Sequence, residues 1–138
     1  MASVLLPGER ALWGRLSAPD RRHAVGVARS VAAALPGADR PVLAAALLHD
    51  VGKLDSGLGT FARVPATVVG AAAGRGRAAR WPGRVGAYLD HPARGAARLR
   101  AAGSAPLTVT WAAEHHLPPA RWSLPRSLAD ALAAADDD

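Results

Sequence analysis

Residues 38–53 read ADRPVLAAALLHDVGK, and this stretch decides the fold class. Asp39 is of a residue type that caps helix starts, and a proline two residues later favours the first turn of a helix. Seven apolar residues follow, mostly alanine and leucine, which are good helix formers. Gly52 is expected to end the helix, because glycine commonly follows the last helical turn. The stretch therefore predicts an apolar helix that carries the polar pair His49 and Asp50 in its last turn.

The same helical character continues along the rest of the chain. Alanine and leucine together supply 51 of the 138 residues and isoleucine is absent, so helix formers outnumber strand formers. Proline and glycine divide the sequence into segments of ordinary helix length. Further helices are expected at residues 8–16, 19–35, 65–73, 92–102, 107–116 and from 125 to the chain end. The sequence therefore predicts an all-α fold, a single compact domain over residues 1–138 built as a bundle of about six to seven helices.

Composition excludes several classes of protein. The longest uninterrupted apolar stretch has seven residues, and no basic segment followed by a long apolar one opens the chain. We therefore expect neither a membrane span nor a secretory signal. The sequence contains no cysteine, so disulfides, thiol nucleophiles and thiolate metal sites are excluded. Such a composition is expected of a cytoplasmic protein.

The net charge of +6 and the isoelectric point near 11.4 raise the question of nucleic-acid binding. Sixteen of the seventeen basic residues are arginine, and asparagine, glutamine and isoleucine are absent, a pattern typical of a GC-rich genome. The densest basic patch, Arg75, Arg77, Arg80 and Arg84, lies in a glycine-rich stretch that suits a solvated loop, although it could line the approach of an anionic ligand. We therefore do not expect nucleic acid to be the main partner.

Histidines and aspartates form the chemical signal of the sequence. Neutral imidazole and carboxylate are the usual ligands of Fe, Mn, Zn, Co or Ni when no thiol is present. A single histidine is most often a packing or surface residue, but an ordered set on several helices indicates a shared site. The candidate ligands in chain order are His23, His49, Asp50, His91, His115, His116 and one late aspartate.

This order of residues resembles the HD-domain proteins of the HD phosphohydrolase superfamily. The most specific match is LLHDVGK at residues 47–53, which follows the family pattern LLHD(I/V)GK and comes after a helix that carries His23. The later segments DHPARG, residues 90–95, and EHH, residues 114–116, resemble motifs of family members that hold two metals. The resemblance covers about residues 19–136, nearly the whole chain.

The resemblance implies a site for one or two divalent transition metals. It assigns the first metal to His23, His49, Asp50 and a final aspartate. It assigns the second metal to Asp50, His91, His115 and His116, with His116 either a ligand or a support for the others. The carboxylate of Asp50 would then bridge the two metals.

The final aspartate is ambiguous in the sequence, because Asp130, Asp136, Asp137 and Asp138 are all candidates. Helical geometry separates the first two. With about 100° per residue counted from Leu128, Asp136 lies about 80° around the helix and Asp130 about 200°. The apolar face includes Leu128, so Asp136 borders the buried side and Asp130 points away from it. Asp136 is therefore the predicted ligand, with Asp130 as the alternative.

The activity that the resemblance implies is metal-dependent hydrolysis of a phosphate ester or anhydride, with a nucleotide or related small phosphorylated molecule as substrate. A bound divalent metal lowers the pKa of its water toward about 7 and so supplies a nucleophile. Lys53 is the only lysine among seventeen basic residues, and its selection where arginine is the default indicates a cation for the substrate phosphate. Asp50 and Lys53 are thus the predicted catalytic residues.

Two other functions remain open from the sequence alone. A di-iron oxygenase is one, because HD-domain oxygenases use the same order of four histidines and two aspartates. A non-catalytic HD module that binds a ligand or partner is the other, although the complete ligand set argues against a retired site. The HD-GYP cyclic-dinucleotide phosphodiesterases share the His115 and His116 pair, but residues 117–119 read LPP where those enzymes carry glycine, tyrosine and proline shortly downstream, so that activity is not assigned.

Overall fold

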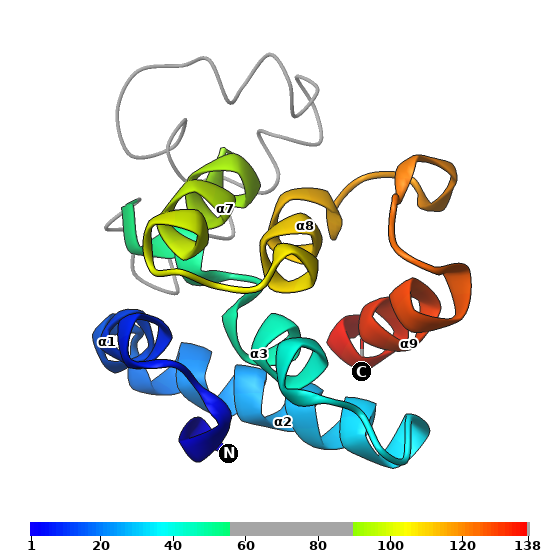
Figure 1. Cartoon of the computed structure of the whole chain (residues 1–138), viewed down its shortest axis with the longest axis horizontal. Coiled ribbons are helices and arrows are strands. Elements are labelled where there is room, and N and C mark those ends of the chain that lie inside the picture. Colours follow the sequence, from blue (N-terminus) through cyan, green and yellow to red (C-terminus); the bar gives the residue numbers. More distant parts are fainter. Residues whose placement is uncertain (56–89, 138) are drawn as a thin grey trace.

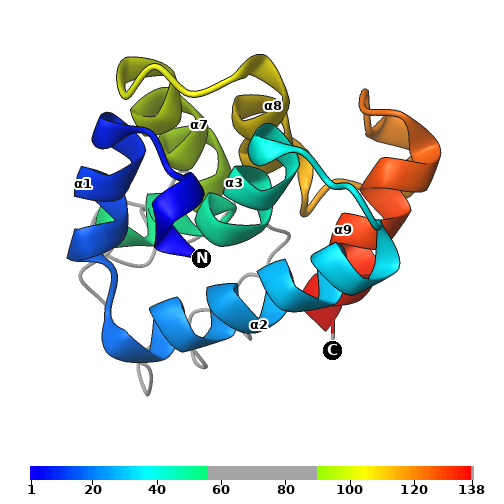
Figure 2. The ribbon, with the colours of Figure 1, turned by 60° about the horizontal axis from the view of Figure 1, so that its bottom comes forward.

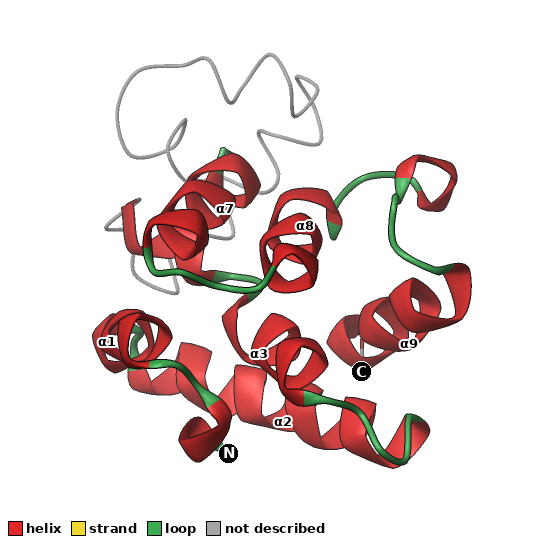
Figure 3. Cartoon of the chain, in the orientation of Figure 1, coloured by secondary structure: helices red, strands yellow, loops and turns green. Residues whose placement is uncertain are grey.

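The computed structural model describes residues 1–55 and 90–137, and these residues form helices and loops without a strand (Figure 3). The α-helices are α1 (Pro7–Arg15), α2 (Ala18–Ala34), α3 (Arg40–Leu48), α7 (His91–Ala101), α8 (Pro106–Glu114) and α9 (Arg126–Asp137). Short 3₁₀ helices are η1 (Ala2–Val4), η2 (Val51–Asp55) and η3 (Pro119–Arg121). The predicted all-α fold is confirmed. The helix predicted at 65–73 and the arginine-rich stretch after it lie outside the described residues.

Helix starts follow the signals of the sequence. Helices α1, α2, α3, α7 and α8 each have proline in the first or second helical position, where its missing N–H costs no hydrogen bond. The predicted cap of α3 is present, because the Asp39 carboxylate accepts a hydrogen bond of 3.2 Å from the backbone N–H of Val42. Asp90 precedes α7 as predicted, but its side chain makes no capping bond and instead lies 3.4 Å from Nε of Arg94. The proline of α7 leaves one fewer N–H for Asp90 to cap.

Helix ends follow the sequence less closely. Helix α7 ends as predicted at Gly103, which has a φ of +77° and lets the N–H of Ser104 bond the carbonyl of Leu99 at 3.0 Å. Helix α3, however, ends at Leu48, before the stop predicted at Gly52. Gly52 lacks the positive φ of a helix-ending glycine; its role is one of space, because a Cβ there would overlap the carbonyl oxygen of His91.

Helix α3 is the centre of the bundle. It packs against α2 on one side and α8 on the other, α7 packs against α8 and η2, and α9 packs along α2 (Figures 1 and 2). Its buried residues are Val42, Ala44, Ala45, Ala46, Leu47 and Leu48. The small alanines allow the neighbouring helices to approach closely, and larger buried side chains such as Leu99, Trp111 and Leu132 fill the space around them.

The arrangement of the helices brings together the helix ends that carry polar residues. The C-terminal ends of α3 and α8, the start of α7 and the last turn of α9 all carry histidine or aspartate. Figure 2 shows α2 running beneath α3 and reaching α9 at one end. None of the helices in the described ranges combines the length and the apolarity needed to cross a bilayer.

Candidate metal centre

The structure gathers all the predicted ligand residues into two neighbouring clusters. In each cluster the ligand atoms, one from each residue, lie within 4.8 Å of one another. The first cluster consists of His23, His49 and Asp136, and the second of Asp50, His91, His115 and His116. These groups come from α2, the end of α3, the start of α7, the end of α8 and the end of α9. The convergence joins segments that are far apart in the sequence.

The first cluster centres on the carboxylate of Asp136. Its Oδ1 lies 2.9 Å from Nε2 of His23 and 3.1 Å from Nε2 of His49. The alternative candidate, Asp130, points away, is half exposed and pairs with Nε of Arg126 at 2.7 Å. Asp137 is exposed, and residue 138 lies outside the described residues. Helix α9 therefore presents Asp136 to the histidines, as its phase predicts.

His23 lies at the rim of the first cluster. Its side chain is 47 % exposed. His49, by contrast, is 1 % exposed and lies deep in the bundle. The first cluster thus has one side open to solvent and one side enclosed by helices.

The second cluster surrounds one oxygen of Asp50. Its Oδ1 lies 3.1 Å from Nε2 of His91 and 3.7 Å from Nε2 of His115. His116 is more exposed and lies beside them, with its Nε2 3.2 Å from Nε2 of His91. His91 is completely buried, although it is the first residue of α7. The later histidines therefore face the same space as Asp50.

Asp50 lies between the two clusters. Its Oδ1 faces His91 and His115, whereas its Oδ2 lies 3.6 Å from Nε2 of His49, a member of the first cluster. The side chain is 14 % exposed. A carboxylate with its two oxygens turned toward two groups of imidazoles has the placement of a bridging ligand.

Backbone carbonyls orient the two most enclosed imidazoles. Nδ1 of His49 donates to the carbonyl of Ala46 at 2.9 Å, and Nδ1 of His115 donates to the carbonyl of Ala112 at 3.0 Å. Because a carbonyl can only accept, the proton of each neutral ring is on Nδ1 and the lone pair is on Nε2. In metal sites the second nitrogen of a ligating histidine is typically held in this way.

The inward nitrogens of these two rings support the fit to a metal. Within the described part of the chain, Nε2 of His49 and Nε2 of His115 are buried and make no hydrogen bond. A buried polar atom without a partner costs free energy, so such atoms are rare in folded proteins. Two imidazole lone pairs aimed at neighbouring carboxylates, with no thiol in the sequence, form a donor set suited to a divalent transition metal.

Burial and mutual charge shift the pKa values of the central groups. Burial alone would raise the pKa of Asp50, but His49, His115, His91 and Lys53 outweigh it and hold that pKa well below its ordinary value. Burial also opposes ionisation of Asp136, but the neighbouring imidazole of His49, whose Nε2 is 3.1 Å away, lowers the pKa of Asp136 strongly. Burial alone would lower the pKa of His49, yet the two carboxylates raise it. Both carboxylates are therefore ionised near neutral pH, as metal ligands must be.

Lys53 lies at the site. Its Nζ forms an ion pair with Oδ2 of Asp50, and its side chain is 16 % exposed. The 3₁₀ geometry of η2 produces this contact, because it places residues three apart on the same side. Lys53 is therefore not a solvated lysine beyond a helix end, and its ammonium group adds positive charge beside the second cluster.

Close backbone contact between η2 and α7 positions His91. The backbone of Gly52 lies against the carbonyl of His91 and the N–H of Gly95, and a Cβ at Gly95 would in turn meet the backbone of Gly52. From its residue type Gly52 is expected only to stop a helix, so this positioning role is not predicted from the sequence. The available signal was the glycine three residues after the proline of DHPARG, which indicates a helix face that another backbone can approach.

Glu114 precedes the histidine pair but turns away from the clusters. Its carboxylate accepts hydrogen bonds of 2.7 Å from the backbone N–H and from the hydroxyl of Ser123. Its backbone carbonyl accepts a hydrogen bond of 3.1 Å from Nε1 of Trp122. Glu114 thus anchors the loop between α8 and α9.

The fold and the two clusters define the class of this protein as an all-helical protein whose histidines and aspartates could hold metal ions. Comparisons with models of protein families, with curated proteins and with solved structures give no match to the chain. The functional argument therefore depends on the residues of the site and their geometry.

Proposed function

We propose that this protein is a metal-dependent phosphohydrolase of the HD-domain class, which cleaves a phosphate ester or anhydride of a nucleotide or related small molecule. The observation that carries the proposal is the position of Asp50 between two clusters of imidazole ligands. Motif order in the sequence supports the family, since each segment that resembles an HD motif contributes a residue to one of these clusters.

The proposed metal ligands follow the two clusters. His23, His49, Asp50 and Asp136 would hold the first divalent metal, and Asp50, His91, His115 and His116 the second. When bound, such metals supply Lewis acidity, which makes water nucleophilic near neutral pH and offsets the charge of a phosphate. Histidine and carboxylate ligands suit Fe, Mn, Zn, Co or Ni.

The chain's own groups prepare the site for this chemistry. Asp50 stays ionised because cationic and imidazole groups surround it, so it can act as a ligand without first losing a proton. The backbone carbonyls that bind Nδ1 of His49 and His115 fix the direction of both rings. Lys53 places an ammonium group beside Asp50, where it can bind a phosphate oxygen of the substrate.

The test is purification of the full chain without chelator, followed by elemental analysis and a hydrolysis screen over nucleotides and simple phosphate esters. We expect one or two transition-metal ions per chain, and hydrolysis that chelator removes and added metal restores. The Asp50→Ala variant should lose both metal and hydrolysis. The matched control is Asp130→Ala, which removes an exposed carboxylate paired only with an exposed arginine among the described residues.

Other results would identify the alternatives. Full metal occupancy without hydrolysis of any phosphate ester would contradict the proposal and favour a non-catalytic module. Oxygen consumption by a mixed-valent di-iron centre would instead favour an oxygenase. The same ligand set serves both metal chemistries, so elemental analysis alone does not decide between them.

A further inference from the structure

A cavity of about 290 Å³ opens on α2 beside the first cluster. Most of its lining comes from one side of α2, and the last turns of α9 complete it. The lining residues are Arg22, His23, Gly26, Val27, Ser30 and Ala135. Its size is close to the lower limit of pockets that hold small organic ligands, roughly 300 Å³.

The cavity adjoins the candidate metal centre. His23 belongs to both, since it lines the cavity and its Nε2 lies 2.9 Å from Oδ1 of Asp136. Ala135, on the opposite wall, directly precedes Asp136 in α9. A molecule with one group at the first cluster can therefore extend into this cavity past the half-exposed ring of His23.

The lining has the chemistry of an anion site. Arg22 supplies a guanidinium group, and among the described residues it makes no hydrogen bond or ion pair. Ser30 adds a hydroxyl group, and no carboxylate of the described residues lines the cavity. Gly26 leaves room, because a Cβ at that position would meet no atom within 4 Å. Arginine is well suited to binding phosphate, since its planar fork of donors matches phosphate oxygens.

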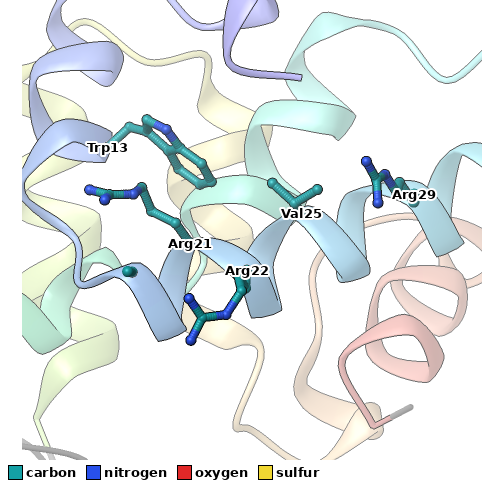
Figure 4. A pocket seen from close by; sticks show the side chains of 6 residues that line it. Trp13, Arg21, Arg22, Val25 and Arg29 are labelled. Atoms are coloured by element: carbon teal, nitrogen blue, oxygen red, sulfur yellow. The ribbon is translucent and has the colours of Figure 1, made fainter.

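Arg22 lies between two hollows on α2 and lines both of them. Figure 4 shows a second groove on α2 that Arg22 also lines, together with Trp13, Val25 and Arg29, and there the guanidinium of Arg22 extends away from the ring of Trp13. Arg21 also lines that groove, but its guanidinium bonds the carbonyl of Leu16 at 2.7 Å and so supports the end of α1. Arg29 is exposed and lines the second groove but not the cavity, so it is a matched control for Arg22.

We propose that the cavity lined by Arg22 and Ser30 binds a second phosphate group of the substrate, so that the enzyme prefers molecules with two phosphates over simple monoesters. This inference rests on the proposed function, because it extends the same site. One phosphate lies at the metal clusters, and the guanidinium of Arg22 binds the other. Val27 and the open space at Gly26 accept the apolar part that joins them.

The test measures binding by calorimetry to the full chain loaded with Mn²⁺, using hexane-1,6-diphosphonate, whose two phosphonates are joined by an apolar linker, and inorganic phosphate as probes. Arg22→Ala should raise the Kd for the diphosphonate about tenfold and change the Kd for phosphate much less, since a hydrogen bond to a charged group is lost. Arg29→Ala should change neither. Gly26→Leu, which fills the cavity without removing charge, should also weaken diphosphonate binding. Circular dichroism and metal analysis check that each variant is folded and loaded.

Each outcome bears on the proposal. Equal losses in Arg22→Ala and Arg29→Ala would overturn it, because they would show only a general charge effect. Unchanged diphosphonate binding in Arg22→Ala and Gly26→Leu would overturn it as well. If the wild type hydrolyses no phosphate ester while diphosphonate binding still depends on Arg22, the phosphohydrolase fails and the anion subsite stands. If the wild type hydrolyses phosphate esters but Arg22→Ala leaves diphosphonate binding unchanged, the phosphohydrolase stands and the anion subsite fails.

Discussion

Nε2 of His23 lies 2.9 Å from Oδ1 of Asp136, a residue 113 positions further along the chain. The same oxygen lies 3.1 Å from Nε2 of His49. One carboxylate near the end of α9 thus meets imidazoles from α2 and from the end of α3. Packing of α9 along α2 makes this meeting possible, and it completes the first cluster.

The Asp136→Ala variant should lose the metal of the first cluster. Only the two histidines of that cluster would remain, together with the more distant oxygen of Asp50. Elemental analysis should show a lower metal content than in the wild type. Asp130→Ala, in the same helix, should keep the full metal content, because its carboxylate pairs with Arg126 at the surface. Equal metal content in both variants would remove Asp136 from the ligand set.

Replacement of Asp50 by alanine should have a larger effect. Both clusters would lose a carboxylate oxygen, so kcat/KM should fall by more than the roughly 10–100-fold that is typical when a supporting partner of a metal ligand is lost. Helical content should persist, since the core residues of α3 are unchanged. Steady-state kinetics and circular dichroism on the same preparation separate the two effects. Loss of helical structure together with activity would mean that Asp50 serves folding.

Lys53→Ala should retain metal while it binds phosphate substrates less tightly. The ammonium group contributes charge beside Asp50 and is not itself a metal ligand. A lost hydrogen bond to a charged group, about 1.5–3 kcal/mol, corresponds to a rise in KM of about tenfold or more. Metal analysis and kinetics on the best substrate provide the measurement. Undiminished kcat and KM in the metal-loaded variant would exclude Lys53 from the active site.

Gly52→Ala should destabilise the protein, because its Cβ would overlap the carbonyl oxygen of His91. Overpacking of this kind typically lowers the free energy of unfolding by about 1–3 kcal/mol. The displacement of α7 should also weaken metal binding at the second cluster. Gly14→Ala is the control, since a Cβ there meets nothing within 4 Å and alanine favours a helix. Urea unfolding of both variants, with and without chelator, measures the difference.

Chelator-treated protein should lose stability as the pH falls below about 4. The pKa values of Asp50 and Asp136 are lower in the folded protein than in the unfolded chain, so acid protonates the unfolded chain preferentially. His49 acts in the opposite direction: its pKa is raised in the folded protein, so its stabilising contribution is lost as the pH rises above its ordinary value of 6.5. Thermal unfolding across this range should therefore show greatest stability at mildly acidic pH. Asp136→Asn should flatten the acidic side, and an unchanged profile would contradict this account.

The positions of the helices could be predicted from local signals. Proline at helix starts, Asp39 as a cap and Gly103 as a stop act within a few residues, so they operate before any tertiary contact forms. The same is true of the phase of α9, which selected Asp136 over Asp130. The end of α3 was predicted less well. Gly52 has the residue type of a helix stop, but its contact with α7 determines its role.

The sequence by itself determined an all-helical fold and the set of histidines and aspartates from which a metal site could be made. The division into two groups that share Asp50 was expected only from a resemblance, and tertiary structure alone brought these residues within contact distance and paired Lys53 with the Asp50 carboxylate. The physical reason is the distance along the sequence over which each interaction acts. Caps and helix phase depend on neighbours within a turn or two, whereas the distance between His23 and Asp136 depends on how α2 and α9 pack across the bundle.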